Sequence, residues 1–158
     1  MANLMQGKAL RDLYIGKKVD RVAEALAGTG TPGDPFFDVH GLCLVTGLLG
    51  VCTVACGVAN TISFEFNPDN AAGANSVLSL AIDLGTAMVA GDVCVLVGAP
   101  GTALLGGHVA VNVLGSTSGK GVVMNDGIIG LVATGATGTY RWILFYVPID
   151  DGAYIDVV

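Results

Sequence analysis

The chain has 158 residues and a net charge of −6, a length that suits one domain with a sizeable buried core. Apolar residues make up 53% of the chain and charged residues only 13%, whereas an ordinary soluble domain carries about 25% charged residues. So few charges cannot cover the surface of a solitary globular protein, and we therefore expect a membrane or neighbouring chains to cover part of it.

The first 27 residues differ from the rest of the chain in charge. They contain five basic and three acidic residues, whereas residues 28–158 contain two basic and ten acidic ones. The sequence therefore predicts a basic N-terminal arm over 1–35, which ends in a Gly/Pro-rich linker, and a separate body over 36–158. Because the opening residues are polar and mixed in charge, we expect no signal peptide.

Within this arm, the stretch VDRVAEALAG (19–28) has the pattern of a short helix. Val19, Val22 and Leu26 recur near helical spacing, and Gly28 can end the helix. Such a helix is too short to be stable alone, so we expect it to dock onto another surface. The following GTGTPG matches the glycine pattern of dinucleotide sites, but its prolines prevent the helix that such a site needs, so we interpret it as a linker.

Two interpretations of the basic arm remain. Its Lys and Arg side chains would bind phosphates in a nucleic-acid arm. In a tether, its apolar side chains would lie in a groove of a neighbouring chain, with the charges paired at the rim. Acidic residues within the arm and the acidic body favour the tether, and we expect no nucleic-acid partner. The residues expected to contact the partner are Lys8, Arg11, Leu13, Tyr14, Lys17, Lys18 and Arg21.

Two long runs without charge, 41–64 and 93–119, are long enough to be tested as membrane spans. Both are interrupted by glycines and hydroxyl side chains, and neither has a basic cluster on one side or an aromatic belt. We therefore expect no membrane partner. A membrane or pore-forming β protein is kept only as the last alternative.

The four cysteines lie in aliphatic surroundings, at Cys43, Cys52, Cys56 and Cys94. On a strand, Cys52 and Cys56 would share one face at a separation of about 13 Å, which is too far for a disulfide or a shared metal ion. We expect buried, reduced thiols that behave as small hydrophobic side chains, and assembly in a cytoplasm.

From residue 36 onward the sequence is typical of β-structure. Segments rich in β-branched and aromatic residues recur about every 8–12 residues and are separated by turn sequences. The segments are VCTVA, TISFEF, VCVLV, HVAVNVL, GVVM, IIGLVAT and RWILFYV. We predict an all-β fold, an antiparallel β-sandwich or barrel of about 8–10 strands, with an extended N-terminal arm that contains one short helix.

Catalytic patterns are sparse in this sequence. The only histidines are His40 and His108, no serine stands in a G-x-S-x-G elbow, and GSTSGKG lacks the spacing of a phosphate loop. The acids Asp150, Asp151 and Asp156 could be taken for a calcium site, but the sequence DDG after Pro148 is more simply a turn that ends the preceding strand. We expect no enzyme activity, no cofactor and no metal site.

The stretch GTYRWILFYVPIDDG near the C-terminus is the most apolar part of the chain. On a strand, Trp142, Leu144 and Tyr146 fall on one face, and Phe145 falls on the other with Ile143 and Val147. We expect one face to pack on the protein's own core and the other to meet a sibling subunit or a shell. The predicted core or oligomer-interface residues are Trp142, Leu144, Phe145 and Tyr146.

The pattern Trp142-x-Leu144-x-Tyr146-x-Pro148-x-Asp150-Asp151-Gly152 resembles the C-terminal signature of small Gly/Ala/Val-rich head proteins of tailed bacteriophages. The segment FFDVHGLCLVTGLLGVCTVA, which opens the β body, is similar in style to those proteins as well. The resemblance implies a virion structural protein, above all a capsid decoration or cement protein that binds the major capsid protein and stabilises the head.

The same resemblance implies a homotrimer on the capsid surface, assembled in the host cytoplasm. Contacts over large apolar areas fit such a role, because cement proteins cover the seams between capsid subunits. The alternative is another virion component, such as a tail, head-fibre or baseplate adaptor protein with a host- or glycan-binding role.

Overall fold

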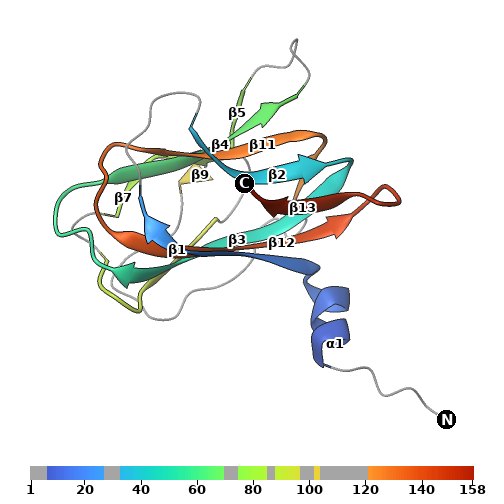
Figure 1. Cartoon of the computed structure of the whole chain (residues 1–158), viewed down its shortest axis with the longest axis horizontal. Coiled ribbons are helices and arrows are strands. Elements are labelled where there is room, and N and C mark those ends of the chain that lie inside the picture. The colour runs from blue at the N-terminus through green and yellow to red at the C-terminus, as the bar shows by residue number, and fades with distance from the viewer. Residues whose placement is uncertain (1–6, 27–32, 70–74, 85–87, 97–101, 104–120) are drawn as a thin grey trace.

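A computed structural model describes residues 7–26, 33–69, 75–84, 88–96, 102–103 and 121–158. Two antiparallel sheets pack face to face as a β-sandwich, and a short helix precedes the first strand (Figure 1). The predicted all-β antiparallel fold is confirmed. The elements are α1 Gly7–Tyr14, β1 Lys17–Ala25, β2 Asp34–His40, β3 Cys43–Val54, β4 Thr61–Pro68, β5 Ser76–Val77, β6 Ser79–Leu80, β7 Ile82–Asp83, β8 Val93–Val95, β9 Thr102–Ala103, β10 Val122–Met124, β11 Gly127–Ala133, β12 Thr139–Pro148 and β13 Tyr154–Val157.

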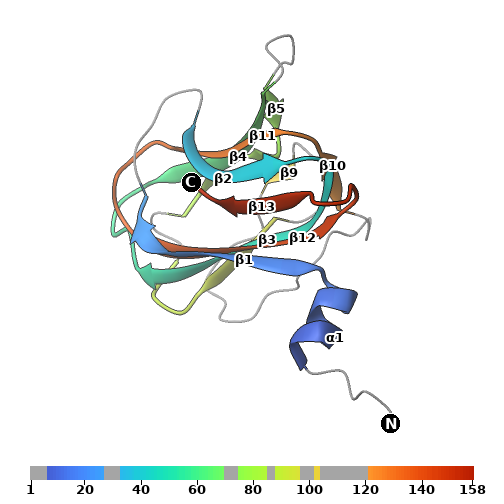
Figure 2. The same ribbon diagram turned by 45° about the vertical axis from the view of Figure 1, so that its right-hand side comes forward.

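The strand order places the first and last strands at the edges of the two sheets. One sheet has the order β1-β12-β3-β10, with β8 also paired to β3; the other has the order β13-β2-β11-β4-β5, with β7 also paired to β4. A short parallel pair, β6 and β9, is separate from both. Figure 2 shows β1 and β13 on the same side of the sandwich. Two sheet edges therefore meet at this side.

Strand β12 lies in the middle of its sheet and supplies much of the core. Its alternate residues Tyr140, Trp142, Leu144 and Tyr146 are all buried, as the period of two along a strand requires. The Trp142 ring contacts rings from both sheets, with centroids 4.9 Å from Phe64 and 5.9 Å from Tyr140. These aromatic contacts join the two sheets, because Phe64 belongs to β4 and Tyr140 to β12.

The space for the Trp142 indole comes from a glycine on the neighbouring strand. Gly50 of β3 is the residue directly opposite Trp142 in the antiparallel register. A Cβ atom at position 50 would lie 2.5 Å from Cζ3 of the indole, much closer than carbon atoms approach without repulsion. The indole therefore occupies the volume that any other residue at position 50 would fill.

The predicted core or interface residues Trp142, Leu144, Phe145 and Tyr146 all lie inside the single chain. Phe145 points away from the other three and is still only 7% exposed. No neighbouring subunit is needed to cover it. The structure supports the core interpretation for these four residues, and on the outer face of β12 the exposed side chains are Arg141 (46%) and Val147 (40%).

The helix predicted over 19–28 is wrong. Residues Lys17–Ala25 form the edge strand β1 instead, with Val19 opposite Leu144 and Arg21 opposite Trp142 of β12. Backbone hydrogen bonding to β12 outweighs the local preference of this segment for a helix, because the edge of β12 would otherwise lack hydrogen-bond partners. The helix lies earlier, at Gly7–Tyr14.

The junction between α1 and β1 depends on Gly16. Its φ of +95° is a conformation that residues with a side chain rarely adopt, and a glycine just after a helix is a common way to end it. A Cβ atom at this position would also collide with the carbonyl oxygen of Tyr146. The chain can therefore leave the helix and enter the sheet at once.

The division of the chain into an arm (1–35) and a body (36–158) follows the strands only in part. Residues 17–25 belong to the sandwich through β1, and β2 begins at Asp34. Helix α1 projects from the sandwich (Figure 1). The strand expected at 108–113 and the loop at 115–120 lie outside the described residues.

Among the residues that are described, no helix is long and apolar enough to cross a membrane.

Replacing Gly50 by alanine tests the contact with Trp142. The added methyl group would displace the indole, and overfilled cores lose about 1–3 kcal/mol of stability. Urea unfolding followed by circular dichroism measures the loss. G135A is the matched control, because a Cβ there would lie 3.4 Å from Asn60 Cγ, in ordinary contact. Equal stability of the two variants would contradict the proposed fit of the indole.

Candidate functional site

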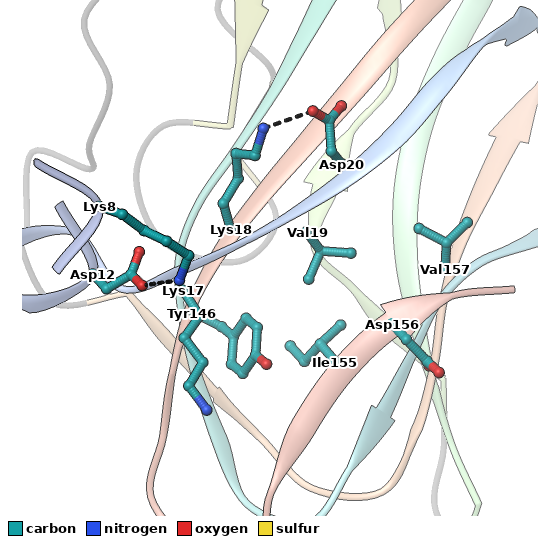
Figure 3. Close-up of a pocket in the computed structure, with 10 residues that line it drawn as sticks. All are labelled: Lys8, Asp12, Lys17, Lys18, Val19, Asp20, Tyr146, Ile155, Asp156 and Val157. Atoms are coloured by element: carbon teal, nitrogen blue, oxygen red, sulfur yellow. Dashed lines mark hydrogen bonds and ion pairs between the residues drawn. The ribbon is translucent and has the colours of Figure 1, made fainter.

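A groove lies between the two sheet edges, β1 and β13. It has a volume of about 540 Å³. Its apolar floor consists of Val19 of β1, Tyr146 of β12, and Ile155 and Val157 of β13, and Figure 3 shows Tyr146 beside Ile155. Charged side chains lie around this floor: Lys8, Asp12, Lys17, Lys18, Asp20 and Asp156. Three lysines against three aspartates leave the rim without net charge, so this groove suits an apolar segment with mixed charges.

Helix α1 flanks one end of the groove and projects away from the sandwich (Figures 1 and 3). Lys8 and Asp12, one turn apart, form an ion pair at 2.6 Å, which supports the helix weakly. Leu10 and Tyr14 lie on one face of the helix by their i, i+4 spacing and are 51% and 90% exposed. The helix therefore presents apolar side chains that the sandwich does not cover.

Of the predicted contact residues, Lys8 and Tyr14 lie on α1 and are exposed, and Lys17 and Lys18 lie at the start of β1 on the groove rim. Arg11 and Leu13 belong to α1, but their side chains lie outside the described part of the structure. The structure thus brings the predicted contact residues of α1 and of early β1 to one side of the molecule.

Arg21 is the exception, because its side chain is engaged within the chain. Its guanidinium lies 4.1 Å from the centre of the Phe36 ring, donates hydrogen bonds to the carbonyl oxygens of Phe36 (2.8 Å) and Val158 (3.0 Å), and pairs with Glu24. The side chain is only 12% exposed. Arg21 therefore ties β1 to β2 and to the C-terminus, and we assign it a structural role.

A second polar link joins β1 to β12 on the surface. Arg141 donates to both carboxylate oxygens of Asp20, and Lys18 pairs with the same carboxylate at 2.7 Å. The hydrogen bond from Arg141 is the main reason why the pKa of Asp20 falls from 3.8 to about 2. Both strands are therefore held in register by side chains as well as by backbone hydrogen bonds.

Burial disfavours the thiolate form of three of the four cysteines. All four are free and buried. Burial raises the pKa of Cys94 to about 12 and raises the pKa values of Cys43 and Cys52, so the nucleophilic thiolate is scarce at neutral pH. The expected strand spacing of Cys52 and Cys56 is wrong, because β3 ends at Val54 and the Cys56 sulfur instead lies 3.9 Å from the Tyr140 hydroxyl.

A cluster of metal-binding side chain types occurs on the outer face of β2 and β13. His40 Nε2 lies 3.4 Å from Asp38 Oδ2 and 3.4 Å from Asp156 Oδ1. This cluster could not be predicted from the sequence, because Asp156 is remote from Asp38 and His40 and nothing in the sequence indicates that β13 pairs with β2. The alternation of Asp38 and His40 around a buried Val39 is the one local signal that both face outward.

Comparison with protein-family models, with curated proteins and with solved structures found no match. The function is therefore inferred from the geometry of the chain and from the features of its sequence.

Replacing Arg21 by alanine should lower the free energy of unfolding by about 1–3 kcal/mol, because charged hydrogen bonds and a cation–π contact are lost together. Thermal and urea unfolding measure this change. K8A is the control: it removes a highly exposed ion pair and should cost about 0.5 kcal/mol or less. An R21A chain as stable as K8A would show that Arg21 is free for another role.

The link between Asp20 and Arg141 predicts a pH dependence of stability. Because the folded-state pKa of Asp20 is lowered to about 2, its contribution is complete above the ordinary value near 4 and is lost as the pH falls toward 2. The stability difference between the native chain and D20N should therefore shrink between pH 5 and pH 2.5 in urea titrations. A difference that does not change with pH would contradict the ion pair.

Proposed function

We propose that this chain is a structural protein of a tailed-bacteriophage virion, and specifically a decoration protein that binds the lattice of major capsid protein and stabilises the head. The resemblance of residues 139–153 to the C-termini of phage head proteins supports this proposal. The low share of charged residues supports it as well, because a decoration protein covers seams between subunits and needs apolar surface for that purpose.

The observation that carries the proposal is the position of α1. An eight-residue helix is marginal in water unless its apolar face is covered. Here the helix projects from the sandwich with Leu10 and Tyr14 exposed, so the sandwich does not supply that cover. A partner chain that buries these two side chains would gain about 1.5–3 kcal/mol from each.

The groove beside α1 offers a second contact for the same partner. In the described part of the chain, β1 pairs only with β12 and β13 only with β2, so each leaves one edge open. Open strand edges accept an added strand from another chain through backbone hydrogen bonds. An extended segment of the capsid protein that lies along the groove would therefore use both the edge and the apolar floor.

Further apolar side chains are exposed around the C-terminal strands, and we assign these to contacts between copies of the chain in a homotrimer. They are Val147 (40% exposed), Ile149 (50%) and Val158 (57%). Val147 lies near the end of β12, Ile149 follows this strand, and Val158 follows β13. A closed trimer would cover such side chains without forming open-ended chains of molecules.

The proposal is tested first on the virion itself. Purified particles of the phage that encodes the chain should contain it in many copies, and cryo-imaging should show it on the outer surface of the head. Its absence from washed particles, or its presence only in the tail, would reject the decoration role. Light scattering of the purified chain then measures whether it is a trimer.

The role of α1 is tested with the double variant L10A/Y14A in a capsid co-sedimentation assay. Loss of two buried apolar side chains, about 3 kcal/mol in total, should weaken binding about 100-fold. The matched control is V54A/V58A, which changes two side chains that are 57% and 56% exposed elsewhere. Equal binding by both variants would reject α1 as the contact. Deletion up to residue 27 is a poorer test, because it would remove β1.

A further inference from the structure

Two carboxylates of neighbouring strands face each other on the outer surface of the sheet that contains β2 and β13. Asp38 of β2 and Asp156 of β13 are directly opposite in the antiparallel register, and His40 is opposite Tyr154. Asp38 and His40 alternate with the fully buried Phe37 and Val39, so both point outward. Like charges directly opposite each other destabilise a sheet, and this pair therefore requires a compensating positive charge.

The described part of the chain supplies that compensation only through His40. Its Nε2 lies 3.4 Å from an oxygen of each carboxylate, and no Lys or Arg side chain of the described residues pairs with Asp38 or Asp156. The side chains of Asp38, His40 and Asp156 are 33%, 39% and 57% exposed. The cluster is thus open to ions from solution.

The imidazole is held in this position by a neighbouring ring. Tyr154 of β13 stacks on His40 with ring centroids 4.3 Å apart and an interplanar angle of 23°. Stacking limits the rotation of the imidazole and keeps Nε2 between the two carboxylates. An ordered ligand group lowers the entropy cost of binding an ion.

The spacing of the three groups matches the coordination of a small divalent ion. Their ligand atoms all lie within 4.8 Å of one another. Ligands at about 2.1 Å from a tetrahedral Zn²⁺ lie about 3.4 Å apart, which is the distance found from His40 Nε2 to each carboxylate. We propose that Asp38, His40 and Asp156 form a binding site for a divalent transition-metal ion, with Zn²⁺ as the ion of choice.

The chemistry of this donor set favours such an ion over calcium or magnesium. One imidazole nitrogen with two carboxylate oxygens suits zinc and the neighbouring transition metals, whereas calcium and magnesium bind through oxygen alone. Three ligands leave at least one coordination position for water or for a group of another molecule. The bound ion neutralises the opposed carboxylates and fastens the C-terminal strand β13 to β2.

The competing explanation is a protonated His40 that forms ion pairs with both aspartates and binds no metal. The two explanations differ in their response to Zn²⁺ at neutral pH. A metal site gives saturable binding with one ion per chain and a rise in melting temperature, whereas a plain ion pair gives neither.

The test is calorimetric titration of the full chain with Zn²⁺ after treatment with a chelator, together with thermal unfolding. We expect one Zn²⁺ per chain, and a melting temperature about 5 °C higher or more when free Zn²⁺ is 100 times the dissociation constant. H40Q and D156N should each weaken binding at least 10-fold, in keeping with the loss of a ligand. Circular dichroism establishes that both surface variants remain folded.

The controls separate this site from others in the chain. H108Q removes the only other histidine and should bind Zn²⁺ like the native chain. A Co²⁺ complex without the absorption bands of thiolate ligands excludes the four cysteines. The proposal is overturned if no saturable binding occurs, or if H40Q and D156N bind as tightly as H108Q. None of these readouts depends on capsid binding, so a failure of the metal-site proposal can be distinguished from a failure of the proposed function.

Discussion

The contact of the Trp142 indole with both sheets is the interaction on which the sandwich depends. The ring fills the space that Gly50 leaves empty on β3 and meets Phe64 of the opposite sheet. The Phe36 ring connects this aromatic cluster to the edge strand β1. The Arg21 guanidinium of β1 stacks on the Phe36 ring, and the centroid of the Trp142 ring lies 6.2 Å from the Phe36 centroid. One buried ring thereby links the centre of the sandwich to the strand that covers its edge.

Strand β12 is covered by its own chain, and this changes the explanation for the small share of charged residues. Both of its faces and both of its edges are occupied mainly by the chain itself, through the core, β1 and β3. Exposed apolar side chains lie on α1, in the groove and around the C-terminal strands, and also at other positions such as Val22 and Val123. The most apolar strand is thus covered by its own chain, and the contacts that we propose with other chains lie outside it.

The sequence predicted the fold class because segments rich in β-branched and aromatic residues recur between turns. It also divided the residues of β12 between two faces, because side chains alternate along a strand. It failed at 19–28, where Val19, Val22 and Leu26 fit helical spacing while the edge of β12 required a strand. The groove and the Asp38–His40–Asp156 cluster depend on which strands pair, and pairing between distant segments is not encoded in local periodicity. Lys8 and Tyr14, two exposed residues of α1, were nevertheless among the predicted contact residues.

The single tryptophan of the chain has a spectroscopic consequence. Trp142 is fully buried among aromatic rings, and its Nε1–H has no acceptor within the described residues. An indole in such apolar surroundings emits at short wavelength and shifts to the red when water reaches it. Neither α1 nor the groove contains a tryptophan, so tryptophan emission, excited apart from tyrosine, reports whether the sandwich is closed and is insensitive to direct contact at those two surfaces. Tryptophan fluorescence of the intact chain therefore separates loss of folding from loss of attachment without any added label.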